Sequence, residues 1–290
     1  MSSVKVKSRT VGRQRHSLCD CHMSRPLLRP KCCDMQIEIP VDVLLNILDY
    51  ADKADLAIMC QVNKICCSCS QDVLYRDICV TDYRREVQRT LAQSTHLARK
   101  VRSFSSYYKF PDLAMALRNM TSLRILKLSS AFYLDILDGC TFKLDSFECT
   151  FLIDYIESFP KIFSSQQSIR YMKLPLHFGS TASSPLEATC LPNLTRINAT
   201  YSWLPYLIPG RPLNEVVMNG YIPHEHSIDL SFFALSTAPI QKLTIDYSCL
   251  SSTPVHLLAS FLPSLTHFTL TVWKHDSFFV YGGVRGLPFY

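Results

Sequence analysis

The chain has 290 residues, of which 48% are hydrophobic and 19% are charged, and its formal net charge is +6. This size and composition suit a folded protein with one large domain or two smaller ones. Only 8 glycines occur, and the patterns GxxxxGK[ST], GxGxxG, GxSxG and HExxH are absent, which argues against nucleotide-binding loops, serine hydrolases and zinc peptidases of the familiar kinds.

Residues 1–34 form a basic segment that is poor in acidic residues. They carry eight Lys and Arg against two Asp, so their net positive charge equals that of the whole chain. We expect a disordered basic leader, while a nuclear signal, a transit peptide and a nucleic-acid arm stay open as alternatives. Met35 directly precedes the first ordered pattern and is a second candidate for the start of translation.

No apolar run approaches the roughly 18 residues of a membrane span, and no apolar signal-peptide region follows the N-terminus. We therefore expect a cytoplasmic or nuclear protein that has no membrane partner, and we consider nucleic acid an unlikely one.

Cysteine is abundant, with 13 residues in the chain, and most of them lie between positions 19 and 79. Without a secretory signal, reduced thiols are the expectation. A zinc site needs two pairs of ligands at chelating spacings, and the C-x-C and C-C steps here are poor ones. We expect no metal and no other cofactor. The two clusters weighed for zinc are Cys19, Cys21, His22, Cys32 and Cys33, and Cys60, Cys66, Cys67 and Cys69.

The segment IPVDVLLNILDY, residues 39–50, predicts a first helix, because its apolar residues recur at i, i+3, i+4 and i+7. Pro40 and Asp42 suit the start of that helix. A second helical pattern runs from a cap at Asp55 through Asn63, and a third covers QDVLYRDI, residues 71–78. A segment of about 40 residues rarely buries enough apolar surface to fold by itself. Its remaining apolar side chains must therefore contact the rest of the chain or another protein.

The same stretch resembles an F-box. The positions that carry the resemblance keep the family's order and spacing: Ile39-Pro40, Asp42, Leu44, Ile47-Leu48, Asp55-Leu56, Val62-Asn63-Lys64 and Leu74-Tyr75-Arg76. It departs from the family at Ala51, where leucine is usual, and at Ile65-Cys66, where tryptophan follows the lysine. The alternative is a plain three-helix segment of a larger core.

The resemblance implies a non-catalytic substrate-receptor subunit of a Skp–cullin–F-box ubiquitin ligase, active in protein degradation. Its F-box would bind a Skp-type adaptor and, through it, a cullin. A ligase-independent interaction scaffold is the alternative, and an enzyme is the least favoured of the three functions. The residues that the resemblance assigns to the adaptor interface are Ile39, Pro40, Leu44, Leu45, Ile47, Leu48, Leu56, Val62 and Leu74.

A unit of the form L-x-x-L-x-L recurs through the remainder of the chain at intervals of 19–27 residues, within the range of leucine-rich repeats. Each unit predicts a strand, and eight parallel strands would span roughly 34 Å. The first apolar positions of the units are Val101, Leu123, Leu144, Ile169, Leu194, Leu213, Ile240 and Leu265.

The spacers between the units alternate between helical patterns and irregular connectors. Residues 110–120, 151–159 and 253–264 show helical spacing, and 180–186 and 204–212 do not. The expected fold class is therefore mixed α/β: a short three-helix F-box followed by an irregular leucine-rich-repeat-like solenoid of parallel strands and helices. An α/β domain without a true repeat is the alternative. The predicted domains are the leader at 1–34, the F-box at 35–80, a helical linker at 81–95 and the solenoid at 96–290.

Cationic residues occupy the positions expected to point outward from these strands, and they favour an acidic or phosphorylated protein substrate. The candidates for substrate binding are Arg124, Lys127, Arg170, Lys173, Arg196 and Lys242, with His267 at an equivalent position. After Leu270 no polar terminal cap is visible, so either the last 20 residues cap the array irregularly or the sequence is truncated.

Overall fold

The computed structural model describes residues 39–81, 85–108, 110–132, 134–152, 158–174, 185–219, 229–246 and 255–271. The basic leader, the first cysteine cluster and the last 19 residues, for which a leader, a zinc site and a terminal cap were weighed, lie outside these ranges. Pro40 to Tyr290 fall into one compact unit.

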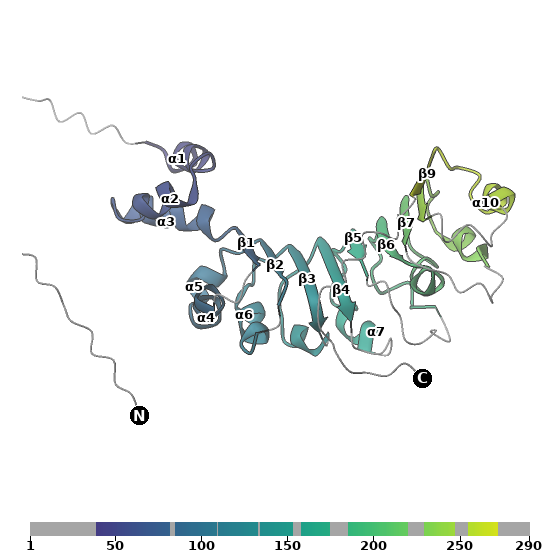
Figure 1. Ribbon diagram of the computed structural model, residues 1–290, viewed down its shortest axis with the longest axis horizontal. Coiled ribbons are helices and arrows are strands. Elements are labelled where there is room, and N and C mark those ends of the chain that lie inside the picture. The colour runs from purple at the N-terminus through teal and green to yellow at the C-terminus, as the bar shows by residue number, and fades with distance from the viewer. Residues whose placement is uncertain are drawn as a thin grey trace, which may run out of the picture. The chain divides into compact units, whose positions relative to one another are not determined.

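A nine-stranded, wholly parallel sheet dominates the described residues, and its strands follow one another in sequence order (Figure 1). The protein is therefore mixed α/β. The strands are β1 (Asp77–Val80), β2 (Ser103–Ser106), β3 (Ile125–Phe132), β4 (Ser146–Leu152), β5 (Tyr171–Lys173), β6 (Arg196–Thr200), β7 (Glu215–Asn219), β8 (Lys242–Asp246) and β9 (His267–Thr271).

Helices precede the sheet and connect its strands, and Figure 1 shows α4, α6 and α7 on one side of the row of strands. The described α-helices are α1 (Val41–Leu48), α2 (Lys53–Met59), α3 (Lys64–Leu74), α4 (Arg85–Gln93), α5 (Thr95–Ala98), α6 (Leu113–Asn119), α7 (Ser158–Phe163), α8 (Leu204–Leu207) and α10 (Val255–Phe261). Three 3₁₀ turns are η1 (Leu134–Leu137), η2 (Tyr201–Trp203) and η3 (Ser231–Leu235).

Each of the eight predicted units forms a strand, and every strand begins two residues after the first apolar position of its unit. Burial alternates along β2 to β8, so one face of these strands packs on the core and the other remains accessible. The buried column runs in register across the sheet and consists of Phe104, Leu126, Phe147, Met172, Ile197, Val216 and Leu243.

The strands are joined by one repeated hydrogen-bond pattern. The carbonyl just before a strand accepts hydrogen bonds from two successive N–H groups, that of the residue before the next strand and that of its first residue, as Arg102 does from Arg124 and Ile125. The pattern recurs from Arg76, which accepts from Arg102 and Ser103, to Gln241, which accepts from Thr266 and His267. It keeps the backbone polar groups at this edge of the sheet satisfied.

The structure corrects five local predictions. The sheet gains a ninth strand because residues 77–80, the first two of which were expected at the end of a helix, pair with β2. The second helix ends at Met59, so Asn63 caps α3, and Asp52 rather than Asp55 caps α2. Residues 151 and 152 belong to β4 instead of a helix, while the supposed connector 204–212 begins with α8.

Two separate apolar cores result from this arrangement. The large core lies under the sheet and includes a group of packed aromatic rings, among them Phe159, Phe163 and Trp203. The small core joins α1, α2 and α3 and contains four buried residues, Leu44, Leu48, Leu56 and Cys69. The segment 39–74 thus buries its own apolar face independently of the sheet.

Candidate functional site

The first candidate site is the surface of α1, α2 and α3. Helix α1 contributes Leu44 and Leu48 to the small core, and α2 contributes Leu56. These leucines are spaced four residues apart on α1, so they share one face of the helix. Ala51, where the F-box pattern has leucine, is partly buried against the same core.

Side-chain caps fix where α2 and α3 begin. The Asp52 carboxylate accepts a hydrogen bond from the Asp55 N–H at 2.8 Å, and the Asn63 amide oxygen accepts one from the Cys66 N–H at 2.8 Å. Such caps satisfy N–H groups that have no partner within the helix. Asp49, after α1, pairs with Arg76 at 2.8 Å, and Lys100 contacts Asp72 of α3.

The structure divides the nine predicted adaptor-binding residues into three groups. Leu44, Leu48 and Leu56 are buried within the small core, so their side chains are not available at the surface in this conformation. Leu45 and Leu74 are half-buried against the same core. The exposed members of the set are Ile39, Pro40, Ile47 and Val62.

Five further large hydrophobic residues of the three helices and their connections, which the sequence analysis did not select, are also exposed: Val41, Val43, Tyr50, Ile58 and Ile65. We name the exposed set Val41, Val43, Ile47, Tyr50, Ile58, Val62 and Ile65 the apolar surface. The signal that could have revealed it is the composition of α1, VDVLLNIL, which has more apolar residues than one helix face holds. So many exposed apolar residues on a segment of fewer than 40 residues make it a candidate for binding another protein.

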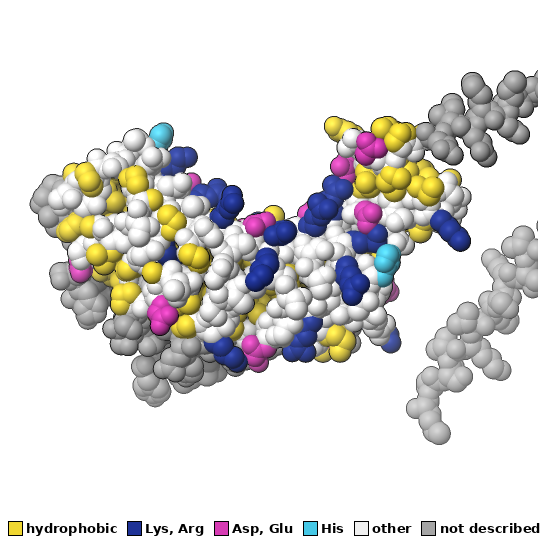
Figure 2. Space-filling model, turned by 180° about the vertical axis from the view of Figure 1, so that it is seen from behind, with side chains coloured by type: hydrophobic (Ala, Val, Ile, Leu, Met, Phe, Trp, Pro, Cys, Tyr) yellow, Lys and Arg dark blue, Asp and Glu magenta, His cyan; other side chains and the backbone are white. Residues whose placement is uncertain are grey.

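The second candidate site is the open face of the sheet, where the predicted residues within the strands lie, whereas Arg124 and Arg170 directly precede β3 and β5. Arg124, Arg170, Arg196, Lys242 and His267 are exposed, and Lys127 and Lys173 are half-buried. In Figure 2, Lys and Arg side chains gather along a hollowed side of the molecule. The register joins Lys127 to Glu148 and Glu148 to Lys173, and Arg196 to Glu215 and Glu215 to Lys242.

Carboxylates neutralise some of these cations. Lys127 Nζ lies 2.7 Å from Glu148 Oε1, whereas Arg124 is 3.9 Å from Asp145. Among the described residues no ion pair joins Arg170, Lys173, Arg196 or Lys242 to a carboxylate. The Arg196 guanidinium instead lies 5.3 Å from the centre of the Tyr171 ring. Burial and the nearby Glu148 raise the pKa of the Tyr171 hydroxyl.

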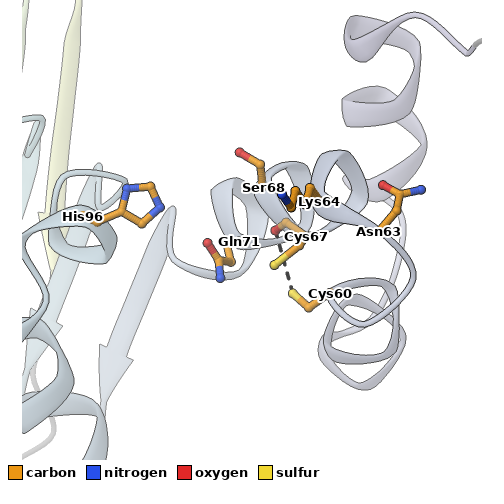
Figure 3. A pocket seen from close by; sticks show the side chains of 7 residues that line it. All are labelled: Cys60, Asn63, Lys64, Cys67, Ser68, Gln71 and His96. Atoms are coloured by element: carbon orange, nitrogen blue, oxygen red, sulfur yellow. Dashed lines mark hydrogen bonds between the residues drawn. The ribbon is translucent and has the colours of Figure 1, made fainter.

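An open pocket of about 490 Å³ lies beside α3 and is lined by Cys60, Asn63, Lys64, Cys67, Ser68, Gln71 and His96 (Figure 3). Cys60 Sγ donates a weak hydrogen bond to the Cys67 carbonyl oxygen at 3.9 Å. Burial raises the pKa of the Cys60 thiol, and the neighbouring Cys67 adds to the effect. A thiol held protonated in this way is a poor nucleophile at neutral pH.

The ranges that the structure covers contain no group of three or more His, Cys, Asp or Glu residues arranged to hold a metal ion. Within the same ranges, no helix is long and apolar enough to cross a membrane. A comparison of the sequence with models of protein families found no match, and a comparison with curated proteins found no significant one.

Proposed function

We propose that this protein is a substrate-receptor subunit of a Skp–cullin–F-box ubiquitin ligase, with the F-box at residues 35–80. The observation that carries the proposal is the apolar surface on a three-helix segment whose own core is already filled by Leu44, Leu48 and Leu56. That segment matches the order and spacing of F-box positions, and its exposed residues suit a Skp-type adaptor. A cullin would join through the adaptor.

The division between buried and exposed residues refines the assignment. Leu44, Leu48 and Leu56 would support the helices from within, while Ile39, Pro40, Ile47 and Val62 would contact the adaptor together with the rest of the apolar surface. The departures at Ala51 and Ile65 would then act differently. Ala51 packs against the small core with a smaller side chain than leucine, whereas Ile65 adds an exposed apolar side chain.

The repeated units would form an irregular leucine-rich-repeat-like solenoid that presents the substrate. Support comes from nine parallel strands in sequence order, from the buried column in register and from the repeated hydrogen-bond pattern at each junction. Neighbouring units stack because each is too small to bury its own apolar face. The open face of the sheet, with its cationic residues, would hold the recruited protein.

The mechanism would be positioning rather than bond chemistry by this chain. Binding the adaptor and a substrate at once raises the effective concentration of substrate lysines near the ubiquitin-conjugating enzyme. Such a receptor works where ubiquitin ligases do, in the cytoplasm or nucleus.

The test is capture of a purified Skp-type adaptor by the full chain. We expect capture by the wild type and a loss of at least about tenfold in affinity for Ile47→Asp, because a buried carboxylate at the interface would lack a partner. Met115→Asp is the matched control, since Ile47 is 55% and Met115 53% exposed but Met115 lies on α6. Its affinity should stay within about twofold of wild type.

Absence of adaptor capture by the wild type would contradict the ligase proposal. An interaction scaffold that works outside a ligase is the second candidate, favoured by the departures at Ala51, Ile65 and Cys66. In that case the chain would capture its protein partner through the sheet but would not bind the adaptor.

A further inference from the structure

Two cysteine thiols contact each other where α2 ends and α3 begins. Cys60 is the residue that follows α2, and Cys67 lies in the first turn of α3. The Cys60 Sγ lies 3.9 Å from the Cys67 carbonyl oxygen, and a side-chain hydrogen bond joins the two thiols. Figure 3 shows the two sulfur atoms directed toward one another from the facing sides of the two helices. The fold thus holds two sulfurs together although their residues are seven positions apart.

Small molecules can reach this pair of thiols. Both cysteines are half-buried, and both line the open pocket of about 490 Å³ beside α3. None of the described residues that line this pocket is acidic, while Lys64 and His96 are exposed there. A pocket with this lining suits a small molecule that carries carboxylates.

The other two cysteines of α3 have different surroundings. Cys69 is 4% exposed within the small core, and Cys66 packs against that core from a half-buried position. Cys66 and Cys67 are adjacent in sequence, so their side chains point about 100° apart around the helix axis. Of the three cysteines on α3, Cys67 is therefore the one that the fold presents to Cys60.

We propose that Cys60 and Cys67 form a reversible disulfide when they meet a small anionic disulfide such as oxidised glutathione. The inference goes beyond the proposed function, since this reaction requires no adaptor. The Cys67 thiolate attacks one sulfur of the oxidant, the S–S bond of the oxidant breaks, and one glutathione leaves. The Cys60 thiolate then attacks the Cys67 sulfur of the mixed disulfide and displaces the second glutathione. Two electrons pass from the cysteine pair to the oxidant, and the two cysteine protons end on the two glutathione thiols.

The order of the two attacks follows from the surroundings of Cys60. Burial and the neighbouring Cys67 raise the pKa of the Cys60 thiol, so this thiol loses its proton less readily and reacts second. Its step is intramolecular, and the contact between the thiols gives that step a high effective concentration. The two sulfurs only need to close from hydrogen-bond contact to the S–S bond length of about 2 Å.

The disulfide would close a loop over residues 60–67. This loop contains Asn63, which caps α3, and Val62 and Ile65, which belong to the apolar surface. A cross-link removes open conformations of the loop that it closes. A protein that binds the apolar surface then meets Val62 and Ile65 at fixed positions relative to the end of α2. Oxidation therefore changes the surface that such a partner contacts, and reduction restores it.

The test is peptide mapping of the purified full chain after incubation with oxidised glutathione. Remaining thiols are blocked with N-ethylmaleimide, the chain is digested with trypsin without reduction, and the peptides are identified by mass spectrometry. Trypsin cleaves after Lys53, Lys64 and Arg76, so Cys60 and Cys67 fall on the separate peptides 54–64 and 65–76. We expect these two peptides to be joined in the wild type and to separate on addition of dithiothreitol.

The test variant is Cys67→Ser, and the matched control is Cys66→Ser, because both remove a half-buried thiol from the first turn of α3. The amount of joined peptides should fall at least about tenfold in Cys67→Ser and stay within about twofold of wild type in Cys66→Ser. Cys60→Ser should lose the joined peptides as well, which keeps the test decisive if Cys67→Ser does not fold. On oxidation of the wild type, hydrogen exchange of amides 61–67 should slow at least about tenfold.

Three outcomes overturn the proposal: no joined peptides in the folded wild type, whether or not glutathione is attached to it, equal amounts of joined peptides in Cys67→Ser and wild type, or joining that requires unfolding of the chain in urea. If the peptides join but hydrogen exchange is unchanged, the inferred effect on the apolar surface is wrong. Adaptor capture is measured on the reduced chain, so failure here is distinguishable from failure of the ligase proposal.

Discussion

Leu243 and Phe268 are register partners on β8 and β9, yet Leu243 is 1% exposed and Phe268 is 43% exposed. Both occupy the column that packs on the core in the earlier strands. The difference arises at β9, the last strand of the described sheet, where Leu270 is also exposed. An apolar residue at this position therefore stabilises β8 more than it stabilises β9.

We expect Leu243→Ala to lower the free energy of unfolding by about 3 kcal/mol, because it removes fully buried atoms and leaves a cavity. Phe268→Ala should cost only about 1 kcal/mol, although it removes a larger side chain. Urea unfolding followed by circular dichroism measures both. A cost for Phe268→Ala equal to or above that for Leu243→Ala would show that Phe268 is covered in solution.

The buried Arg211 is the basis of a second prediction. Its guanidinium donates hydrogen bonds to five backbone carbonyl oxygens, those of Leu186, Glu187, Cys190, Leu207 and Pro209, at 2.8–3.3 Å. It thereby ties the loop before β6 to the end of α8, and its burial lowers its pKa. Arg211→Met leaves these acceptors without a donor and should cost at least about 3 kcal/mol of unfolding free energy.

The control for Arg211 is Arg196→Met, which removes an exposed guanidinium and should change the unfolding free energy by less than about 0.5 kcal/mol. Denaturant titration of both variants gives the comparison. Equal stability of the two would mean that water replaces the guanidinium at the carbonyls.

The caps of α2 and α3 give a third prediction. Asp52→Ala and Asn63→Ala should each destabilise their helix by about 1 kcal/mol, because the N–H groups of Asp55 and Cys66 lose their acceptors. Hydrogen exchange of the α2 and α3 amides should quicken in these variants. Asn46→Ala, at an exposed position within α1, is the control and should leave protection unchanged or raised.

A fourth prediction concerns alkaline pH. Burial raises the pKa of Tyr206 to about 12, with a smaller contribution from Cys190. Between pH 10 and 12 the unfolded chain therefore loses this proton while the folded chain keeps it, and stability falls as the pH rises. The contribution of one such group is at most about 1.4 kcal/mol per pH unit.

Unfolding of wild type and Tyr206→Phe, measured at pH 8, 10 and 11, isolates this contribution. The variant should lose less stability than wild type between pH 10 and 11, because phenylalanine has no proton to release. Parallel loss in the two proteins would show that other groups account for the alkaline sensitivity, among them Tyr171 and Tyr201, whose pKa values burial also raises.

The positions of the strands were predictable because a strand that packs on one face needs apolar residues at alternate positions, and this requirement is local. All eight units, from the one at Val101 to the one at Leu265, form strands. The prediction of parallel strands was correct for the same reason, since similar units separated by similar spacers pack side by side. β1 was missed because Ile78 also continued a helical spacing, and only pairing with Phe104 decides between the two.

The candidate sites were predictable as regions but not as individual contacts. Apolar spacing on α1 placed Leu44 and Leu48 on one face, but it did not show that they fill a core and leave Ile47 and Val43 exposed. Outward positions on the strands located Lys173 and Arg196, yet the sequence did not show that Glu148 pairs with Lys127 or that Arg196 covers Tyr171.

By itself, the sequence determined the fold class, the number and order of eight of the nine strands, and the buried side of β2 to β8. The tertiary structure alone decided which carboxylate neutralises which cation, which leucines lie inside the small core, and that Arg211 is buried among carbonyls. The physical reason is distance along the chain. Periodicity within a few residues encodes burial, whereas a contact between neighbouring strands joins residues about 20 or more positions apart and depends on the register that packing selects.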